Sequence, residues 1–484
     1  MPAFNLPLLY DTIIVDILNV FCTYSYNGFN STIDSKVFSR MVASQIWGDH
    51  ETGKLTNDEA HAALAKEFKV NIDDVRSAMI GAITTLSPRQ EMVDLIRSLK
   101  SGRKIYAMSN MSEHSWNMIR HAKPTHWDIF DDVFISGSVG YRKPEMLFYQ
   151  HVLQKTGAKP LHTIFLDDTQ ENLATARIFG IRPIIFDSFS NLERTLINLC
   201  GDPVSRAKAF LVRNSKKHHS YASTGQIIYE NFCQLMILEA TQDPSIVDYR
   251  VHKEEWNFFQ RSSGQYTDAI FPADLDTTFM AWTVIPEVTT DTVKHRIMDR
   301  VISDLLDNDG IPLSYFDRNR ARRDHGVCVN VLSMFYASGR GHEVERATDY
   351  VYSLLESGAY LEGSRYYRSP ETFLYFCSRL LERSSLLECR MGDLLKECCR
   401  QRIGSPTDPL ALAMRLHCCT RRGLDASVDF KKLIELQQVD GGWEGGIIYT
   451  YGLVNITVGN RGLTTAIAHR AITEYLSKFG PTSS

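Results

Sequence analysis

The segment Asp274-Leu275-Asp276-Thr277-Thr278 places two carboxyl groups one residue apart, followed by two hydroxyl groups. Apolar and aromatic residues flank it on both sides, with Phe271 before it and Phe279 and Trp282 after it. Burial and a charged neighbour can keep one carboxyl of such a pair protonated at neutral pH. A neutral carboxylic acid in an apolar pocket is able to protonate an unactivated alkene. The segment therefore predicts acid chemistry in a buried site.

The region around this segment, from about residue 225 to 484, has the pattern of an all-α domain. Amphipathic stretches separated by Gly, Pro, Asp or Ser predict helices at residues 226–239, 291–306, 344–356, 370–381 and 409–421. No strand alternation stands out, so a helical barrel or bundle is expected. Two segments, 260–266 and 438–443, share the order Gln, short spacer, Gly, one residue, aromatic.

Residues 1 to about 200 have the pattern of a separate α/β domain. Short apolar runs predict buried parallel strands at residues 12–15, 104–108, 163–166 and 183–186, with helices such as 90–99 and 172–179 between them. Residues from about 21 to 90 form a mostly helical insert after the first strand. The pattern is poorer from about 201 to 224, and we expect the linker between the two domains there.

Polar residues follow three of these strands, at the edge where ligand chemistry collects in open α/β sheets. Asp16 follows the first strand, Ser109-Asn110 the second and Asp167-Asp168 the third, while Lys143 lies between the second and third. Converging aspartates can hold Mg²⁺ through oxygen ligands, and a lysine and a hydroxyl can bind phosphate oxygens. An aspartate among them can attack phosphorus. The set predicts magnesium-dependent phosphoryl chemistry.

This order and spacing resemble the haloacid dehalogenase-like (HAD-like) hydrolase superfamily, with a helical cap inserted after the first strand. The resemblance implies a Rossmann-like domain over residues 1–200, with its cap at about 21–90. It implies that Asp16 is the nucleophile and a metal ligand. The remaining implied roles are Mg²⁺ binding by Asp167 and Asp168 and phosphate binding by Ser109, Asn110 and Lys143.

One position departs from the family pattern. Phosphatases of the superfamily carry a second aspartate two residues after the nucleophile, where this chain has Leu18. Leucine cannot protonate a leaving group. Two alternatives therefore stay open at this point: a working phosphatase, helped by the good leaving group of a diphosphate, or a retained fold with a weakened site.

The segment that begins at Asp274 resembles the acid motif of class II terpene cyclases, and the two Gln-to-aromatic segments resemble the QW motifs of that α/α-barrel family. By this resemblance Asp276 donates the proton, Asp274 orients Asp276 by hydrogen bonding, and Thr277 takes the place of a third acid. Aromatic faces can stabilise the carbocation; the candidates are Phe271, Trp282, Tyr315, Phe316, Tyr366 and Tyr367. Arginines can bind the diphosphate; the candidates are Arg318, Arg320, Arg322, Arg323, Arg365 and Arg368.

A HAD-like domain at 1–200, a linker at 201–224 and a class II cyclase domain at 225–484 together resemble the drimane-type sesquiterpene cyclases. The resemblance implies cyclisation of farnesyl diphosphate to a bicyclic drimane or albicane diphosphate, with Leu18 leaving its later hydrolysis to the alcohol open. An alternative is a plain HAD-like hydrolase with a helical specificity domain. A third is a helical interaction scaffold with two vestigial sites.

Composition and charge restrict the classes of partner and the cellular location that are expected. The net charge of −4 and the absence of a long like-charge run disfavour a nucleic-acid partner. Asp11 and Asp16 interrupt the first apolar stretch, so neither a signal peptide nor a membrane span is expected. The ten cysteines show no C-x-x-C spacing, which favours reduced thiols over a zinc site. A cytoplasmic enzyme acting on a small prenyl diphosphate is expected.

Overall fold

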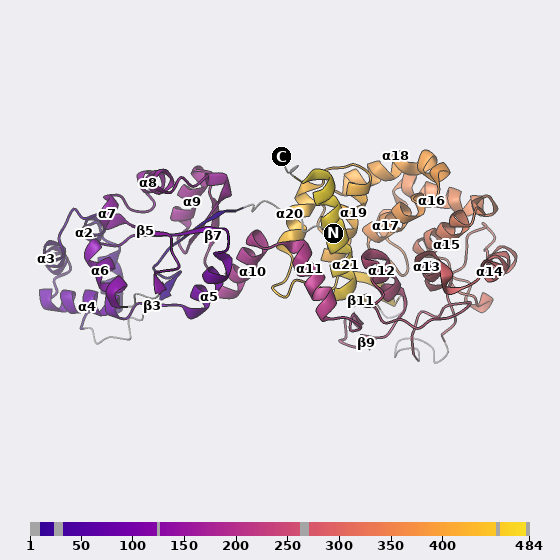
Figure 1. Cartoon of the computed structure of the whole chain (residues 1–484), viewed down its shortest axis with the longest axis horizontal. Helices are drawn as coiled ribbons and strands as arrows, with labels where there is room; N and C mark the ends of the chain where they lie inside the picture. Colours follow the sequence, from indigo (N-terminus) through magenta and orange to yellow (C-terminus); the bar gives the residue numbers. More distant parts are fainter. Residues whose placement is uncertain (1–9, 24–31, 123–125, 262–270, 452–454, 481–484) are drawn as a thin grey trace. The chain divides into compact units, whose positions relative to one another are not determined.

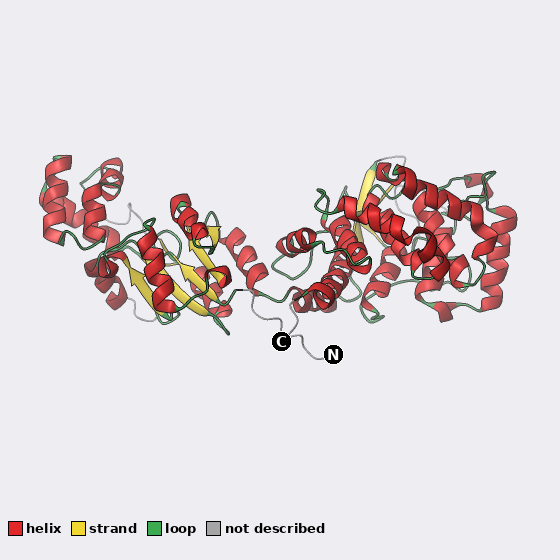
Figure 2. Cartoon of the chain, turned by 90° about the horizontal axis from the view of Figure 1, so that it is seen from above, coloured by secondary structure: helices red, strands yellow, loops and turns green. Residues whose placement is uncertain are grey.

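The structure, a computed structural model, divides the chain into two compact units, Met1–Gly201 and Asp202–Ser484. It describes residues 10–23, 32–122, 126–261, 271–451 and 455–480 (Figure 1). Figure 2 shows strands within a helical surround in the first unit and mostly helices in the second. Among the described residues, no helix combines the length and the apolar character needed to cross a bilayer.

A parallel sheet with the strand order β5-β4-β1-β6-β7 forms the centre of the first unit. The predicted strands are confirmed to within one or two residues, and β5 is an additional strand that the sequence pattern did not predict. The bounds are β1 Thr12–Val15, β4 Lys104–Ser109, β5 Asp132–Ile135, β6 Thr163–Asp167 and β7 Arg182–Ile185.

Successive side chains of each strand point to opposite faces of the sheet, and both faces are covered. Ile13 and Val15 pack with α5 (Gln90–Leu99) and α10 (Phe189–Cys200). Ile14 packs on the other face with α8 (Met146–Thr156) and α9 (Gln170–Ile178). Burial on both faces explains why these strands are apolar runs rather than alternating ones.

The insert after β1 is a helical cap with its own small core. Its helices are α1 (Ser35–Val42), α2 (Gln45–Glu51), α3 (Asn57–Phe68) and α4 (Ile72–Thr84). A capping box fixes the start of α3, since the Thr56 hydroxyl accepts from the Glu59 amide and the Glu59 carboxylate accepts from the Thr56 amide. A short antiparallel pair, β2 (Cys22–Thr23) with β3 (Ser87–Pro88), closes the insert at its base.

Within the expected linker at 201–224, residues 202–224 are instead folded and belong to the second unit. Asp202 caps helix α11 (Pro203–Arg213), which packs against α21 (Arg461–Phe479). Ser220–Ala222 then forms strand β8. The segment with the poorer pattern is therefore an ordered part of the second unit.

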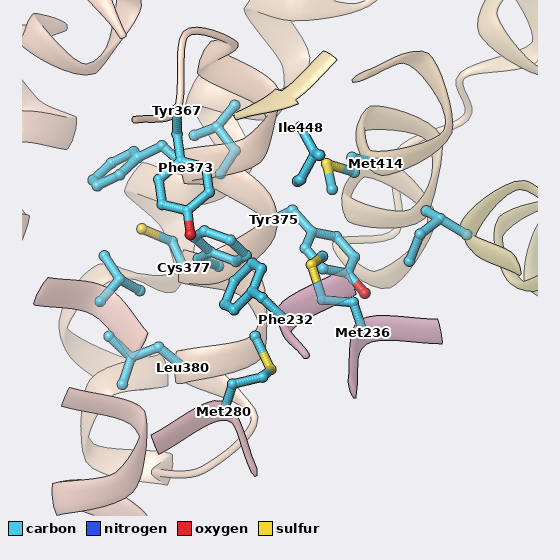
Figure 3. Packing of buried hydrophobic residues seen from close by; sticks show 14 of the residues in the cluster. Phe232, Met236, Met280, Tyr367, Phe373, Tyr375, Cys377, Leu380, Met414 and Ile448 are labelled. Atoms are coloured by element: carbon cyan, nitrogen blue, oxygen red, sulfur yellow. The ribbon is translucent and has the colours of Figure 1, made fainter. Parts of the chain in front are cut away.

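Buried helices form a closed ring in the second unit. Each of α12, α13, α15, α17, α19 and α21 contacts the next, and α21 contacts α12. Nearly every residue of α13, α15, α17 and α19 is buried, as expected for helices that are apolar on all sides. Figure 3 shows Phe232, Met280, Tyr375 and Met414 in the cluster between them. The bounds are α12 Phe232–Thr241, α13 Leu275–Val284, α15 His325–Ala337, α17 Pro370–Leu381 and α19 Pro409–Arg421.

More amphipathic helices and a small sheet complete this unit. The helices are α14 (Asp291–Asp304), α16 (Glu345–Ser357), α18 (Ser385–Arg402) and α20 (Ser427–Glu435). The antiparallel sheet has the order β10-β11-β8-β9, with β9 at Ile227–Ile228, β10 at Ile447–Tyr451 and β11 at Ile456–Gly459. The expectation of helix from residue 226 and of no strands is therefore wrong. Isoleucine, tyrosine and threonine, which favour strands, fill β10.

Candidate active sites

Three carboxylates meet at the edge of the first unit's sheet. β1 and β6 are neighbours in parallel register, with Val15 opposite Leu166, so Asp16 and Asp167 leave the sheet side by side. One oxygen from each of Asp16, Asp167 and Asp168 lies within 4.8 Å of the others. Three converging carboxylate oxygens form the hard donor set that Mg²⁺ prefers. The structure thus brings together all three predicted metal ligands.

Lys143 lies within this cluster and is only 2% exposed. Its ammonium is 2.8 Å from Asp16 Oδ1 and 2.6 Å from Asp167 Oδ2. Asp167 also accepts hydrogen bonds from the Thr169 amide and the Asn172 side chain, both at 2.9 Å. Burial raises the pKa of Asp16 to about 7, and the Lys143 charge offsets part of that rise.

Ser109 and Asn110 have different environments. The Ser109 hydroxyl is buried at the end of β4 without a hydrogen-bond partner in the described residues, so it is available to a phosphate oxygen. Asn110 was expected to bind phosphate, but both of its side-chain groups contact the Lys143 backbone. Its Nδ2 donates to the Lys143 carbonyl at 2.9 Å, and its Oδ1 accepts from the Lys143 amide at 2.7 Å. Asn110 therefore positions the lysine.

Leu18 is half-buried and packs against the apolar cluster beneath the sheet edge. The cap supplies a different carboxyl nearby, which sequence reasoning missed. Glu51, the last residue of α2, forms an ion pair of 3.0 Å with Arg142, and its carbonyl accepts a hydrogen bond from Ser136. Burial raises the pKa of Glu51 to about 7.

The acid segment of the second unit begins helix α13. Asp274 is the N-cap residue, and its Oδ1 accepts a hydrogen bond of 2.6 Å from the Thr277 amide. The cap places Asp276 in the first turn, where the helix enters the buried ring. Thr277 therefore contributes its amide to the cap, and its side chain is fully buried.

Asp276 is 7% exposed and is held by two donors from other helices and loops. Asn330 of α15 donates to Oδ1 at 2.7 Å, and the Tyr367 hydroxyl donates to Oδ2. Asp274 was expected to orient Asp276 by a hydrogen bond. In the described residues the hydrogen bonds to Asp276 come from Asn330 and Tyr367 instead, while Asp274 Oδ1 accepts from the cap amide and Asp274 Oδ2 is buried without a hydrogen-bond partner.

A buried ion pair fixes the Asn330 amide. Arg379 of α17 donates to Asn330 Oδ1 at 2.8 Å, so Asn330 Nδ2 is directed toward Asp276. Two further hydrogen bonds, of 2.7 and 2.9 Å, join Arg379 to Glu239 of α12. Asp276 is thus held by a chain of contacts across the ring of helices.

Both acids of the segment are electrostatically suited to hold a proton near neutral pH. Burial raises the pKa of Asp276 to about 7, against the hydrogen bonds from Tyr367 and Asn330, which lower it. Burial also raises the pKa of Asp274 to about 8. The charge of Asp276 contributes to the raised pKa of Asp274.

Several of the predicted aromatics gather near these acids. The ring of Phe271 is 5.5 Å from that of Tyr315, and the hydroxyls of Tyr315 and Tyr366 are 2.8 Å apart. Tyr315 pairs with Asp274 in a short antiparallel bridge. Trp282, by contrast, packs inside the core against Phe279. The aromatic side chains beside the acids are therefore those of Phe271, Tyr315, Tyr366 and Tyr367.

The QW-like segments have structural contacts. Trp443 is fully buried, and its indole donates to the Leu433 carbonyl at 2.7 Å. The Gln260 side chain donates to the carbonyls of Glu230 and Asp248. Residues 262–266 of that first segment lie outside the described residues. These contacts hold loops against helices and contribute no catalytic group to the site around Asp274 and Asp276.

Known proteins match both units. Residues 17–180 match the haloacid dehalogenase-like hydrolase family, and residues 204–338 match the sesquiterpene cyclase astC-like C-terminal domain. The drimenol cyclase of Aspergillus calidoustus is 39% identical over 450 residues, which cover 92% of this chain and 84% of that protein. The chain belongs to this family of sesquiterpene cyclases. The fold class expected from the sequence is confirmed, and the plain hydrolase alternative has less support.

Two further matches concern the first unit alone. A sesquiterpene phosphatase of Aspergillus oryzae is 29% identical over 158 residues, which cover 32% of this chain and 80% of the phosphatase. A solved HAD family enzyme of Bacteroides thetaiotaomicron, in complex with magnesium and inorganic phosphate, is 18% identical. That match covers 38% of this chain and 98% of the other, with a TM-score of 0.31. The two family matches, at residues 17–180 and 204–338, place a HAD-like hydrolase domain before the cyclase domain of this chain.

Replacing Arg379 with methionine is expected to destabilise the cyclase domain by about 3 kcal/mol, because the largely buried Glu239 would keep only the more distant Arg383, at 3.8 Å, as an ion-pair partner. Urea unfolding followed by circular dichroism measures this change. The double variant Arg379→Met, Glu239→Gln removes both charges and should recover most of the loss. A single variant within about 1 kcal/mol of the wild type would contradict the contribution assigned to this pair.

Proposed function

We propose that the second unit cyclises farnesyl diphosphate by protonation. Asp276 transfers its proton to the terminal alkene, the resulting cation closes two rings in succession, and loss of a proton gives a bicyclic drimane or albicane diphosphate. The carbon–oxygen bond to the diphosphate stays intact in this step. The observation that carries the proposal is Asp276 itself, a buried acid with a pKa near 7, in a domain of the sesquiterpene cyclase family.

The surroundings of Asp276 support this chemistry. Hydrogen bonds from Asn330 and Tyr367 stabilise the carboxylate that remains after proton transfer. The faces of Phe271, Tyr315 and Tyr366 can stabilise the carbocation. Closely packed apolar helices exclude the water that would quench it.

We further propose that the first unit hydrolyses the bicyclic diphosphate to the alcohol. Asp16 attacks the terminal phosphorus, which forms an aspartyl-phosphate and expels the bicyclic monophosphate, and water then hydrolyses the aspartyl-phosphate to inorganic phosphate. A second such cycle on the monophosphate releases the alcohol. Lys143 and Ser109 bind the phosphoryl oxygens, and Asn110 keeps Lys143 in place. Mg²⁺, for which Asp16, Asp167 and Asp168 supply ligands, would neutralise the phosphoryl charge. Hydrolysis without an aspartate at position 18 is supported, in the first cycle, by the low basicity of the phosphate-monoester leaving group, while the alkoxide that leaves in the second cycle takes its proton from solvent. It is also supported by the similarity of this unit to a sesquiterpene phosphatase.

The test is incubation of the purified chain with farnesyl diphosphate and Mg²⁺, with the organic extract analysed by mass spectrometry. A bicyclic alcohol of the drimenol or albicanol type is expected without further treatment. If the alcohol appeared only after phosphatase was added, the cyclase proposal would stand and the hydrolase proposal would fail. Farnesol without any bicyclic product would favour the plain hydrolase.

The cyclisation rate is expected to fall as the pH rises, because the reaction requires a protonated acid. Asp276 must be protonated to act, so the rate should be highest below about pH 7 and fall about tenfold per pH unit well above it. The measurement is kcat for total bicyclic product between pH 6 and 9, after complete dephosphorylation of each extract. A flat profile over this range, with the fold intact by circular dichroism, would exclude Asp276 as the proton donor.

A further inference from the structure

A cationic hollow lies beside the acid site of the second unit. It has a volume of about 330 Å³ and polar walls that include Arg323, His325, Ser364, Arg365 and Arg368. Asp324, Tyr350, Glu362 and Gly363 complete the walls. The cluster of arginines and a histidine around one depression indicates an anionic ligand.

The arginines of the hollow differ in whether a carboxylate pairs with them. Arg323 forms ion pairs with Asp307 and Asp309, at 3.2 and 2.9 Å. For Arg365 and Arg368, no carboxylate within the described residues lies at ion-pair distance. Arg365 Nε and His325 Nε2 are buried without a hydrogen-bond partner in that same part of the chain. A buried Arg365 Nε–H without an acceptor is costly, so this hollow favours a ligand that brings oxygen atoms.

Two acidic residues of the walls, Asp324 and Glu362, neutralise little of the arginine charge in the hollow. The Asp324 carboxylate caps α15 through the amides of Gly326 and Val327 and accepts from the Tyr366 amide at 3.1 Å. Its charge is therefore engaged by backbone donors. Glu362 is exposed to solvent, where water screens it. The exposed guanidinium of Arg368 and the partly buried one of Arg365 remain available.

One tight turn connects the hollow to the proton donor. The Ser364 amide donates to the Tyr367 carbonyl at 2.7 Å, and the Tyr367 amide donates to the Ser364 hydroxyl at 2.9 Å. The turn presents Arg365 to the hollow, and Tyr367 extends from it to Asp276. Strand β10 holds the turn, because Thr450 bonds to the carbonyls of Arg365 and Tyr366.

Given the cyclisation proposed above, on which this inference rests, we propose that the hollow binds the diphosphate of the prenyl substrate. Arg365 and Arg368 pair with its oxygens, and the Ser364–Tyr367 turn sets the spacing between the diphosphate and the acid. In the folded substrate the diphosphate and the protonated alkene lie at opposite ends of the two rings that form. A binding site one tyrosine side chain away from Asp276 matches that separation.

The test compares Arg365→Gln, Arg368→Gln and the double variant with the wild type. Each single variant is expected to raise KM for farnesyl diphosphate about tenfold and the double variant about 100-fold, while kcat changes less than KM. Arg365→Lys should recover part of the loss, since it keeps the charge but not the planar fork. Arg421→Gln is the matched control: its exposed guanidinium pairs with Glu382, and its KM should stay within about twofold of the wild type.

Calorimetry with inorganic pyrophosphate separates this proposal from the proposed reaction. In EDTA, the carboxylates around Asp16 repel the anion, so binding to the wild type should report the hollow and should be lost in the Arg365→Gln, Arg368→Gln variant. If the double variant changed neither KM nor pyrophosphate binding, the hollow would not be the diphosphate site. This conclusion would hold whether or not the wild type forms a bicyclic product. If the wild type made no bicyclic product but bound pyrophosphate through these arginines, the hollow would stand and the cyclisation would fail.

Discussion

Replacing Asp276 with asparagine is expected to lower the rate of bicyclic product formation by at least about 10⁴-fold. Asparagine keeps the size of the side chain and can still meet Tyr367 and Asn330, but it has no proton acidic enough to protonate an alkene. The measurement is total bicyclic alcohol from farnesyl diphosphate after phosphatase treatment. Hydrolysis of a simple phosphate ester by the first unit should be unchanged in the same preparation.

The matched control is Asp393→Asn, which removes an exposed carboxyl from α18. Its cyclisation rate should equal that of the wild type within about twofold. Should Asp276→Asn retain more than about one-hundredth of the wild-type rate, another group would have to supply the proton. The buried Asp274, with its raised pKa, would then be the next residue to substitute.

Replacing Asp16 with asparagine is expected to give the complementary result. Without the nucleophile, release of the alcohol should fall by at least about 10⁴-fold, while the bicyclic diphosphate accumulates at the wild-type rate. The physical reason is that the amide cannot attack phosphorus and contributes one charge less to the metal site. Phosphate release and the unhydrolysed diphosphate are measured in the same reaction by liquid chromatography and mass spectrometry.

Asp94→Asn serves as the control in the first unit, because Asp94 is an exposed residue of α5. Its alcohol release should match that of the wild type. Undiminished alcohol release from Asp16→Asn would mean that hydrolysis occurs elsewhere and that the HAD-like site has lost its activity. Opposite effects of the Asp276 and Asp16 substitutions would show that the two reactions belong to separate sites.

The fold of the first unit was predictable because its strands are buried on both faces. Apolar runs that end in polar residues placed Asp16, Ser109 and Asp167 at one edge, and the register of β1 with β6 confirms that arrangement. The short strand β5 was missed because its first residue, Asp132, is exposed and breaks the apolar run. The segment 201–224 was misassigned because composition does not reveal that α11 packs against α21.

The site of the second unit was predictable only in part. The segment from Asp274 to Thr278 stands out locally, whereas the partners of Asp276 lie 54 and 91 residues away along the chain. A signal for part of this network was present: Asn330, which bonds to Asp276, and Arg379, which bonds to Asn330, are polar residues within mostly apolar, mostly buried helices. Such residues are rarely buried unless they are paired. Their specific partners could come only from the packing of α12, α13, α15 and α17.

The most direct test of the central claim is to run the reaction in D₂O and locate deuterium in the bicyclic product. Asp276 exchanges its proton with solvent between turnovers, so a protonation-initiated cyclisation must place a single deuterium at the carbon that was the terminal alkene CH. We expect one non-exchangeable deuterium at that carbon, seen as a unit mass shift and located by NMR. A bicyclic product without deuterium would contradict proton transfer from Asp276 and require a reaction that begins by ionising the diphosphate.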